Sequence, residues 1–122
     1  MKNVLVVDDS LYMREIIKAA LTNSGKYTIV GEAKNGNEGI EKALELKPDA
    51  ITMDNILPDM LGIDVIKEMR IENVESKIIM VSAVGQQNVI QECLESGADD
   101  YLVKPFDGDK LIERLDKLFP AE

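Results

Sequence analysis

Short apolar segments alternate along the chain with longer segments in which apolar residues recur every three or four positions. Nearly continuous apolar runs are typical of strands buried on both faces of a parallel sheet. The pattern predicts strands at Asn3–Asp8, Tyr27–Ala33, Asp49–Asp54, Lys77–Ser82 and Asp99–Lys104. The second of these is more mixed in character, which suits an edge strand.

The intervening segments have the spacing of amphipathic helices. Ser10 is a candidate N-cap for a helix that runs to about Asn23, and Gly25 lies just past its end. Further helices are predicted at Asn37–Leu46, Gly62–Ile71, Gln87–Ser96 and Asp107–Phe119. Strict alternation of strand and helix predicts a single α/β domain over residues 1–122, a doubly wound (βα)5 parallel sheet with right-handed crossovers.

Composition narrows the classes of function. The chain has 122 residues and a net charge of −9, and its 14 basic residues are scattered, so we expect no nucleic-acid partner. It has no histidine, which excludes histidine-based zinc sites, Ser-His-Asp triads and a phosphohistidine carrier. The single Cys93 excludes an internal disulfide and fits a reducing cytosol. We expect no signal peptide and no membrane-spanning segment.

Polar residues follow four of the predicted strands at the points where the strands end. They are Asp8 with Asp9, Asp54, Ser82 and Lys104. In an open parallel sheet these ends meet at one edge, where such folds place their sites. Taken alone, each of these residues is equally consistent with an ordinary turn or a solvent-exposed surface position, with no functional role. Their joint placement predicts a magnesium and phosphoryl site.

The chemistry of these side chains suggests a role for each. The adjacent acids Asp8 and Asp9 repel one another, and Mg²⁺, a hard ion that takes oxygen ligands, would relieve the repulsion. Asp54 is the candidate nucleophile, because a carboxylate can accept a phosphoryl group as an acyl phosphate. Ser82 and Lys104 would contact the phosphoryl oxygens. A cis bond before Pro105 would turn the lysine inward, although trans is the usual form.

Four segments together resemble the response-regulator receiver domain over essentially the whole chain: Val4–Arg14, Thr52–Gly62, Val81–Ala83 and Tyr101–Phe106. The stand-alone length and the start of the chain are most similar to chemotaxis members of that family. The resemblance implies a flavodoxin-like fold with strand order 2-1-3-4-5. The glycine patterns of P-loop and dinucleotide-binding proteins are absent.

The resemblance also implies the chemistry. Asp54 would accept its phosphoryl group from a phosphohistidine on a sensor histidine kinase (CheA-like). Mg²⁺ would be held by Asp9, Asp54 and the backbone carbonyl of Ile56, with Asp8 acting through water. Ser82 and Lys104 would contact the phosphoryl group.

The same resemblance implies a switch and an output face. The Ser82 hydroxyl would move toward the phosphoryl group while the Tyr101 ring turns inward. A motor or motor-adaptor protein would then bind the fourth helix, fifth strand and fifth helix, at a face that includes Gln87, Gln91, Asp99, Tyr101, Val103 and Phe106. We expect a cytoplasmic monomer with no membrane partner.

Three positions affect this expectation. Leu61 stands where the family usually has Asp, before Gly62. Ile56 and Val84 flank the site at positions that tune dephosphorylation in the family, and neither apolar side chain can position an attacking water. We therefore expect a phosphoacceptor with only slow self-dephosphorylation, not an enzyme.

Other functions stay open at this point. A relay receiver that passes phosphate to a histidine phosphotransfer protein would share every site residue. An interaction module that works without phosphorylation would have little need of the full acid, serine and lysine set. A metal-dependent phosphatase for other substrates would need a substrate pocket.

Overall fold

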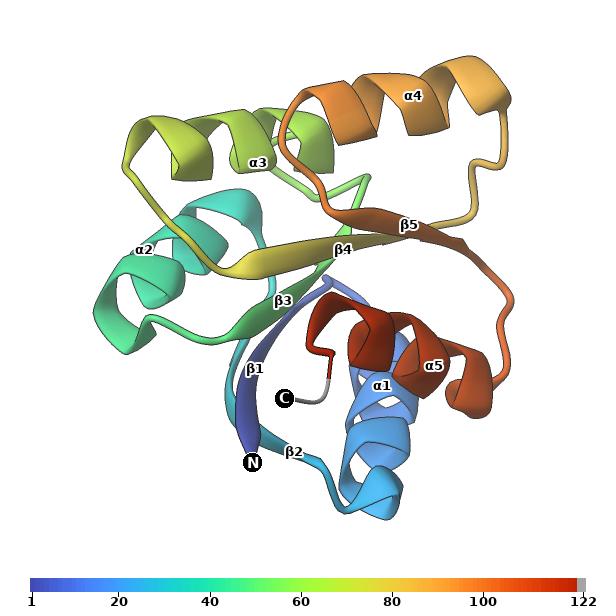
Figure 1. The fold of residues 1–122 in the computed structure, drawn as a ribbon. Helices are drawn as coiled ribbons and strands as arrows, with labels where there is room; N and C mark the ends of the chain where they lie inside the picture. The colour runs from blue at the N-terminus through green and yellow to red at the C-terminus, as the bar shows by residue number, and fades with distance from the viewer. Residues whose placement is uncertain (121–122) are drawn as a thin grey trace.

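Five parallel strands form one twisted sheet in the order β2-β1-β3-β4-β5. The computed structural model describes residues 1–120 of the chain (Figure 1). The strands are β1 (Lys2–Val7), β2 (Tyr27–Ala33), β3 (Ala50–Asp54), β4 (Lys77–Ser82) and β5 (Asp100–Val103). The helices are α1 (Leu11–Ser24), α2 (Gly36–Leu46), α3 (Gly62–Ile71), α4 (Gln87–Glu95) and α5 (Gly108–Leu118).

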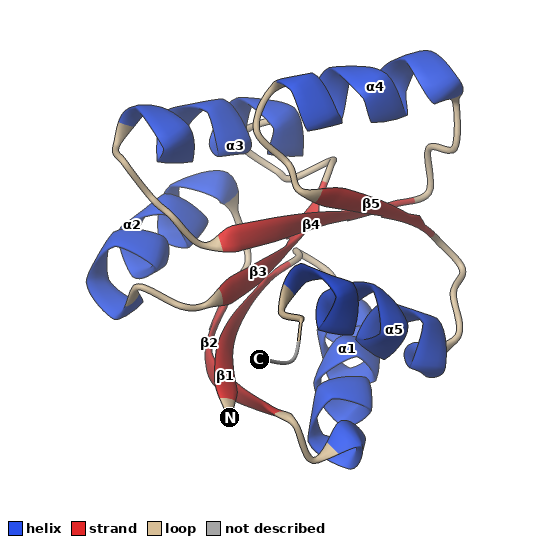
Figure 2. Ribbon diagram, in the orientation of Figure 1, coloured by secondary structure: helices blue, strands red, loops and turns tan. Residues whose placement is uncertain are grey.

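The helices cover both faces of the sheet. Helices α1 and α5 lie on one face, and α2, α3 and α4 lie on the other (Figure 2). The predicted fold class and strand order are confirmed, and β2 lies at an edge as its mixed sequence indicates. Among residues 1–120, no helix combines the length and the apolar character needed to cross a membrane.

Element bounds differ from the prediction by only a few residues. Strand β1 is shifted one residue toward the N-terminus, and β5 is shorter than predicted at both ends. The side chain of Asp99 accepts a hydrogen bond from the N–H of Ile78 at 2.8 Å, which makes this residue part of the turn before β5. Pro105 prevents β5 from continuing, because proline has no N–H to donate to a neighbouring strand.

Alternate residues of each central strand serve opposite halves of the core. In β1, Val4 and Val6 pack with Ile17 of α1 and Leu111 of α5. Leu5 and Val7 point to the other face, where they join the cluster that includes residues of α2, α3 and α4. All four β1 side chains are at most 1% exposed. The sheet is therefore buried on both faces, and its polar groups gather at the strand ends.

The ends of α1 follow from its sequence. The Ser10 side chain accepts a hydrogen bond from the N–H of Met13 at 3.2 Å, which is the predicted N-cap. Gly25 ends the helix in the left-handed conformation with φ of 71°. By contrast, the residue at the N-cap of α3 is Leu61, whose side chain forms no cap hydrogen bond.

We expect a capping side chain at this position to stabilise the protein. Leu61→Asn should have a free energy of unfolding about 1 kcal/mol higher than that of Leu61→Ala, because the asparagine oxygen can accept a free N–H of the first turn. The Leu61 side chain is 50% exposed, so both variants lose little packing. Urea unfolding followed by circular dichroism measures the difference. Equal stability of the two variants would contradict the expected capping.

Candidate functional site

Three carboxylates meet at the edge of the sheet where the strands end. Asp8 and Asp9 follow β1, and Asp54 is the last residue of β3. Strands β1 and β3 are direct neighbours, with Val7 paired to Met53. Each acid offers an oxygen, and these oxygens lie within 4.8 Å of one another. A compact set of oxygen donors fits Mg²⁺.

Lys104 brings a positive charge to the same cluster. Its Nζ lies 3.1 Å from Oδ2 of Asp8 and 3.4 Å from Oδ1 of Asp54. The Lys104–Pro105 peptide bond is cis. The lysine side chain is 17% exposed and the Asp8 side chain 2%, so this ion pair is largely shielded from solvent. The cation therefore partly neutralises the acids and remains close enough to contact a group bound to Asp54.

The environment of Asp54 works against its ionisation. Burial raises the pKa of its carboxyl, and the neighbouring Asp8 charge raises the pKa further. Lys104 lowers the pKa through its charge and its hydrogen bond. The raised pKa of Asp54 indicates that its negative charge is destabilised by these surroundings. A cation bound to the carboxylate, or a phosphoryl group attached to its oxygen, would reduce this destabilisation.

The loop after Asp54 is fastened at two points. The carboxylate of Asp59 accepts the N–H groups of Gly36 at 2.7 Å and Asn37 at 3.0 Å, which begin helix α2. These hydrogen bonds lower the pKa of Asp59. Ile56 and Leu61 form an antiparallel bridge across the loop. The loop thus holds the Ile56 backbone near Asp54, while the Ile56 side chain is 62% exposed.

Ser82 and Tyr101 are linked through one loop residue. Ser82 ends β4, is 2% exposed, and its Oγ accepts the N–H of Val84 at 3.1 Å. The hydroxyl of Tyr101 donates to the carbonyl of Val84 at 2.5 Å. The ring of Tyr101 is already turned inward and is 6% exposed, so it does not belong to the exposed part of the expected output face. Gln87, Gln91 and Val103 are exposed there.

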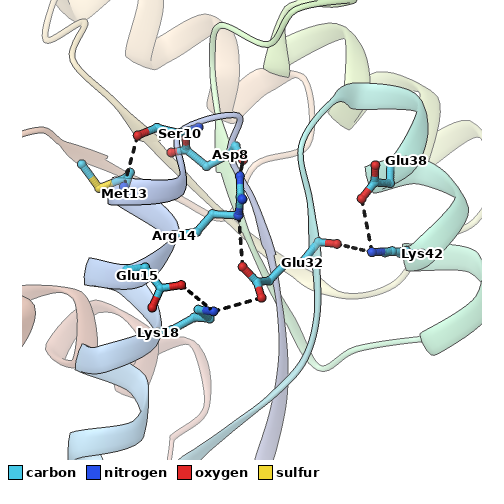
Figure 3. A network of polar contacts seen from close by, with 9 residues as sticks. All are labelled: Asp8, Ser10, Met13, Arg14, Glu15, Lys18, Glu32, Glu38 and Lys42. Carbon is cyan, nitrogen blue, oxygen red and sulfur yellow. Dashed lines mark hydrogen bonds and ion pairs between the residues drawn. The ribbon is translucent and has the colours of Figure 1, made fainter.

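Two residues near the acids were not singled out from the sequence. Arg14 lies buried on the inward face of α1, in line with Ile17 and Leu21. It donates a hydrogen bond to the carbonyl of Asp8 and forms an ion pair with Glu32 of β2 (Figure 3). The sequence carried one signal of this position: Arg14 precedes Ile17 by three residues and Leu21 by seven, which puts it on the apolar face of the predicted helix. An exposed arginine is unusual on such a face.

Residues 4–116 match the model of the response regulator receiver domain. This match covers most of the chain, including β1 from Val4 onward and the segments that carry all the acids described above. The chain belongs to the response-regulator receiver family. Receivers of this family are signalling domains. At 47% and 41% identity to two chemotaxis proteins named CheY, this receiver is closely related to them.

The relatives of this receiver span nearly the same length. The chemotaxis protein CheY of Thermotoga maritima is 47% identical over 117 residues, which are 96% of this chain and 97% of that protein. The chemotaxis protein CheY of Bacillus subtilis is 41% identical and covers 93% of this chain and 94% of its own. The similarity therefore extends over nearly the full length of both chains in each pair.

Solved structures agree with the fold of the receiver. CheY in the CheX–CheY–BeF3–Mg complex of Borrelia burgdorferi superposes with a TM-score of 0.93 at 30% identity, over 98% of this chain and 90% of that chain. The response regulator domain of Thermotoga maritima CheB gives a TM-score of 0.90 at 34% identity, over 100% of this chain and 98% of that one.

Proposed function

We propose that this receiver takes a phosphoryl group onto Asp54 from a phosphohistidine of a sensor histidine kinase, in a Mg²⁺-dependent reaction, and thereby changes the binding of a partner protein. One observation carries the proposal. Asp54 stands beside two further acids whose oxygens lie within 4.8 Å, with the Lys104 ammonium 3.4 Å away. This is the arrangement expected for an acid that must become an acyl phosphate.

The transfer step exchanges one bond to phosphorus for another. An oxygen of the ionised Asp54 attacks phosphorus, a P–O bond forms, and the P–N bond to the donor imidazole breaks. The imidazole leaves with the electron pair of that bond and takes up a proton. Lys104 is placed to donate a hydrogen bond to a phosphoryl oxygen and to reduce the negative charge around it. The Ser82 hydroxyl, at the end of the neighbouring strand, would donate to another.

The metal would be held by this chain's acids and one carbonyl. We assign Asp9, Asp54 and the backbone carbonyl of Ile56 as ligands, with Asp8 acting through water. The bound ion would supply positive charge for the phosphoryl oxygens. Asp8 is 1% exposed and Asp9 is exposed, which fits this division between an indirect and a direct ligand.

Metal binding should stabilise the folded receiver. Mg²⁺ at about tenfold its dissociation constant should add roughly 1.4 kcal/mol to the free energy of unfolding, because the unfolded chain lacks the assembled acids. Urea unfolding with Mg²⁺ or with EDTA measures the difference. Asp9→Asn should show a much smaller response. A midpoint that does not change with Mg²⁺ would contradict the metal assignment.

The biological context is proposed from the relatives. Two of them, at 47% and 41% identity over nearly their full lengths, are chemotaxis proteins. We therefore assign this receiver to cytoplasmic chemotaxis signalling, with a CheA-like kinase as donor and a motor or motor-adaptor protein as the partner of the α4–β5–α5 face. The exposed Val103, Gln87 and Gln91 would contact that partner.

Phosphotransfer tests the pathway. The chain is mixed with ³²P-labelled CheA-like kinase, and the label is followed from kinase to receiver. Transfer that is lost in Asp54→Ala, followed by capture of a motor-side protein that is weakened by Val103→Lys, supports the proposal. Onward transfer of the label to a histidine phosphotransfer protein, without motor binding, would instead establish a relay receiver.

The phosphoryl group should be long-lived on this chain. The exposed Ile56 side chain cannot hydrogen bond to an attacking water, so Ile56→Asn should shorten the lifetime of the acyl phosphate several-fold. Ile56→Val is the matched apolar control. Loss of label after removal of the donor gives both rates. An unchanged lifetime in Ile56→Asn would contradict the expectation.

A further inference from the structure

Arg14 makes a buried polar connection between α1 and the acidic site. Its side chain is 9% exposed. Nη1 donates to the backbone carbonyl of Asp8 at 2.8 Å, and Nε donates to Oε1 of Glu32 at 3.0 Å (Figure 3). A buried charge is costly unless it is paired and hydrogen-bonded, so a residue kept in this place has to be held by both partners.

The carbonyl that Arg14 contacts belongs to the peptide group between Asp8 and Asp9. A peptide group is planar and rigid, so the position of its oxygen also fixes the direction in which the chain enters Asp9. The carboxylate of Asp8 is held separately. Its Oδ1 accepts the N–H of Ser10 at 2.9 Å, and its Oδ2 accepts from Lys104 at 3.1 Å. Arg14 therefore holds the carbonyl of the peptide group that joins Asp8 to Asp9.

Glu32 sets the direction of the Arg14 guanidinium. It lies on the edge strand β2, opposite Val6 of β1, and faces α1. Its second carboxylate oxygen accepts from Lys18 at 3.0 Å. The hydrogen bond from Lys18 and that from Arg14 lower the pKa of Glu32, although burial opposes them. Glu32 thus remains charged at neutral pH and holds Arg14 against the sheet.

We propose that Arg14, oriented by Glu32, is a positioning residue that sets the geometry of the Asp8–Asp9 turn for the metal. This inference rests on the proposed magnesium site and adds to it two residues that do not touch the ion. Contacts of this indirect kind orient ligands, and their loss typically weakens metal binding about 10–100-fold.

The structure offers a matched arginine for the test. Arg70 also donates to backbone carbonyls, those of Val74 at 2.7 Å, Ser76 at 3.0 Å and Gly97 at 2.8 Å. Among residues 1–120 its hydrogen bonds reach the loops after α3 and α4 and none of the three acids. Arg14→Gln and Arg70→Gln therefore both remove carbonyl contacts, but only the first affects the acidic turn.

The measurement is the dissociation constant for Mn²⁺ alone, from electron paramagnetic resonance of the free ion, and for Mg²⁺ alone, from calorimetry. Arg14→Gln should bind either ion about tenfold more weakly than the wild type, and Arg70→Gln should bind as the wild type does. Arg14→Lys should recover part of the affinity, because its ammonium can reach the carbonyl but cannot hold Glu32 at the same time.

A second pair keeps the test decisive if Arg14→Gln does not fold. Glu32→Gln leaves Arg14 in place but loosens it, and should weaken Mn²⁺ binding about threefold. Glu113→Gln breaks ion pairs with Lys110 and Lys117 on α5, none of which contacts Glu32 or Arg14 within residues 1–120, and should change nothing. Wild-type affinity in folded Arg14→Gln and Glu32→Gln, or an equal loss in the Arg70 variant, would overturn the positioning role. Failure of the wild type itself to bind either ion would instead overturn the proposed metal site.

Discussion

Gly62→Ala is expected to destabilise the protein by about 3 kcal/mol and to abolish phosphorylation of the remaining folded fraction. A Cβ at Gly62 would lie 2.2 Å from the carbonyl oxygen of Asp54 and 2.8 Å from Cα of Asn55. Both are backbone atoms, so no side chain can rotate to make room. The chain must move at the residue that carries the proposed nucleophile.

Gly85→Ala is the matched control for this substitution. A Cβ there would lie 3.5 Å from the nearest atom, a methyl group of Val103, which is an ordinary contact. Thermal unfolding and acetyl phosphate labelling of both variants give the comparison. A Gly62→Ala protein that melts and labels like Gly85→Ala would show that the close packing of the loop against Asp54 is not required.

Lys104→Met should slow phosphorylation of Asp54 by about 10²–10³-fold, the effect typical of removing one donor to a developing oxyanion. The Lys104 ammonium contacts both Asp8 and Asp54, at 3.1 and 3.4 Å. Methionine fills a similar space without the charge, so the loss reports on electrostatics more than on packing. The initial rate with acetyl phosphate at saturating Mg²⁺ measures the effect.

Lys117→Met is the control, because Lys117 is 67% exposed and pairs with Glu113 on the same helix. It should label at the wild-type rate. Labelling of Lys104→Met within a factor of a few of that rate would contradict the role assigned to the lysine. Removing the ammonium leaves the buried Asp8 carboxylate without its cation and lowers the stability of the variant, so its rate is compared on folded protein at saturating Mg²⁺, whose charge offsets the loss.

Much of the fold could be predicted from periodicity. The continuous apolar runs of β1, β3 and β4 indicate buried strands, and the strict alternation of strand and helix indicates a parallel sheet with right-handed crossovers. Elements ended within a few residues of prediction because Ser10, Gly25 and Pro105 act locally. The mixed sequence of β2 similarly placed it at an edge.

The convergence of Asp8, Asp9, Asp54 and Lys104 could be predicted for a related reason. Parallel strands share one end, so residues at that end of each strand become neighbours whatever their distance in sequence. The contacts of Arg14 with Asp8 and Glu32 could not, because they depend on where α1 crosses the sheet. The hydrogen bonds from the start of α2 to Asp59 likewise depend on tertiary packing, and so does the inward position of the Tyr101 ring.

Intact mass after incubation with acetyl phosphate tests the central claim most directly, with Mg²⁺ or with EDTA, for the wild type and for Asp54→Ala. We predict one added phosphoryl group in the wild type, only with Mg²⁺, and none in the variant. No addition to the wild type in the presence of Mg²⁺, or addition that persists in Asp54→Ala, would contradict the assignment of Asp54 as the phosphoacceptor.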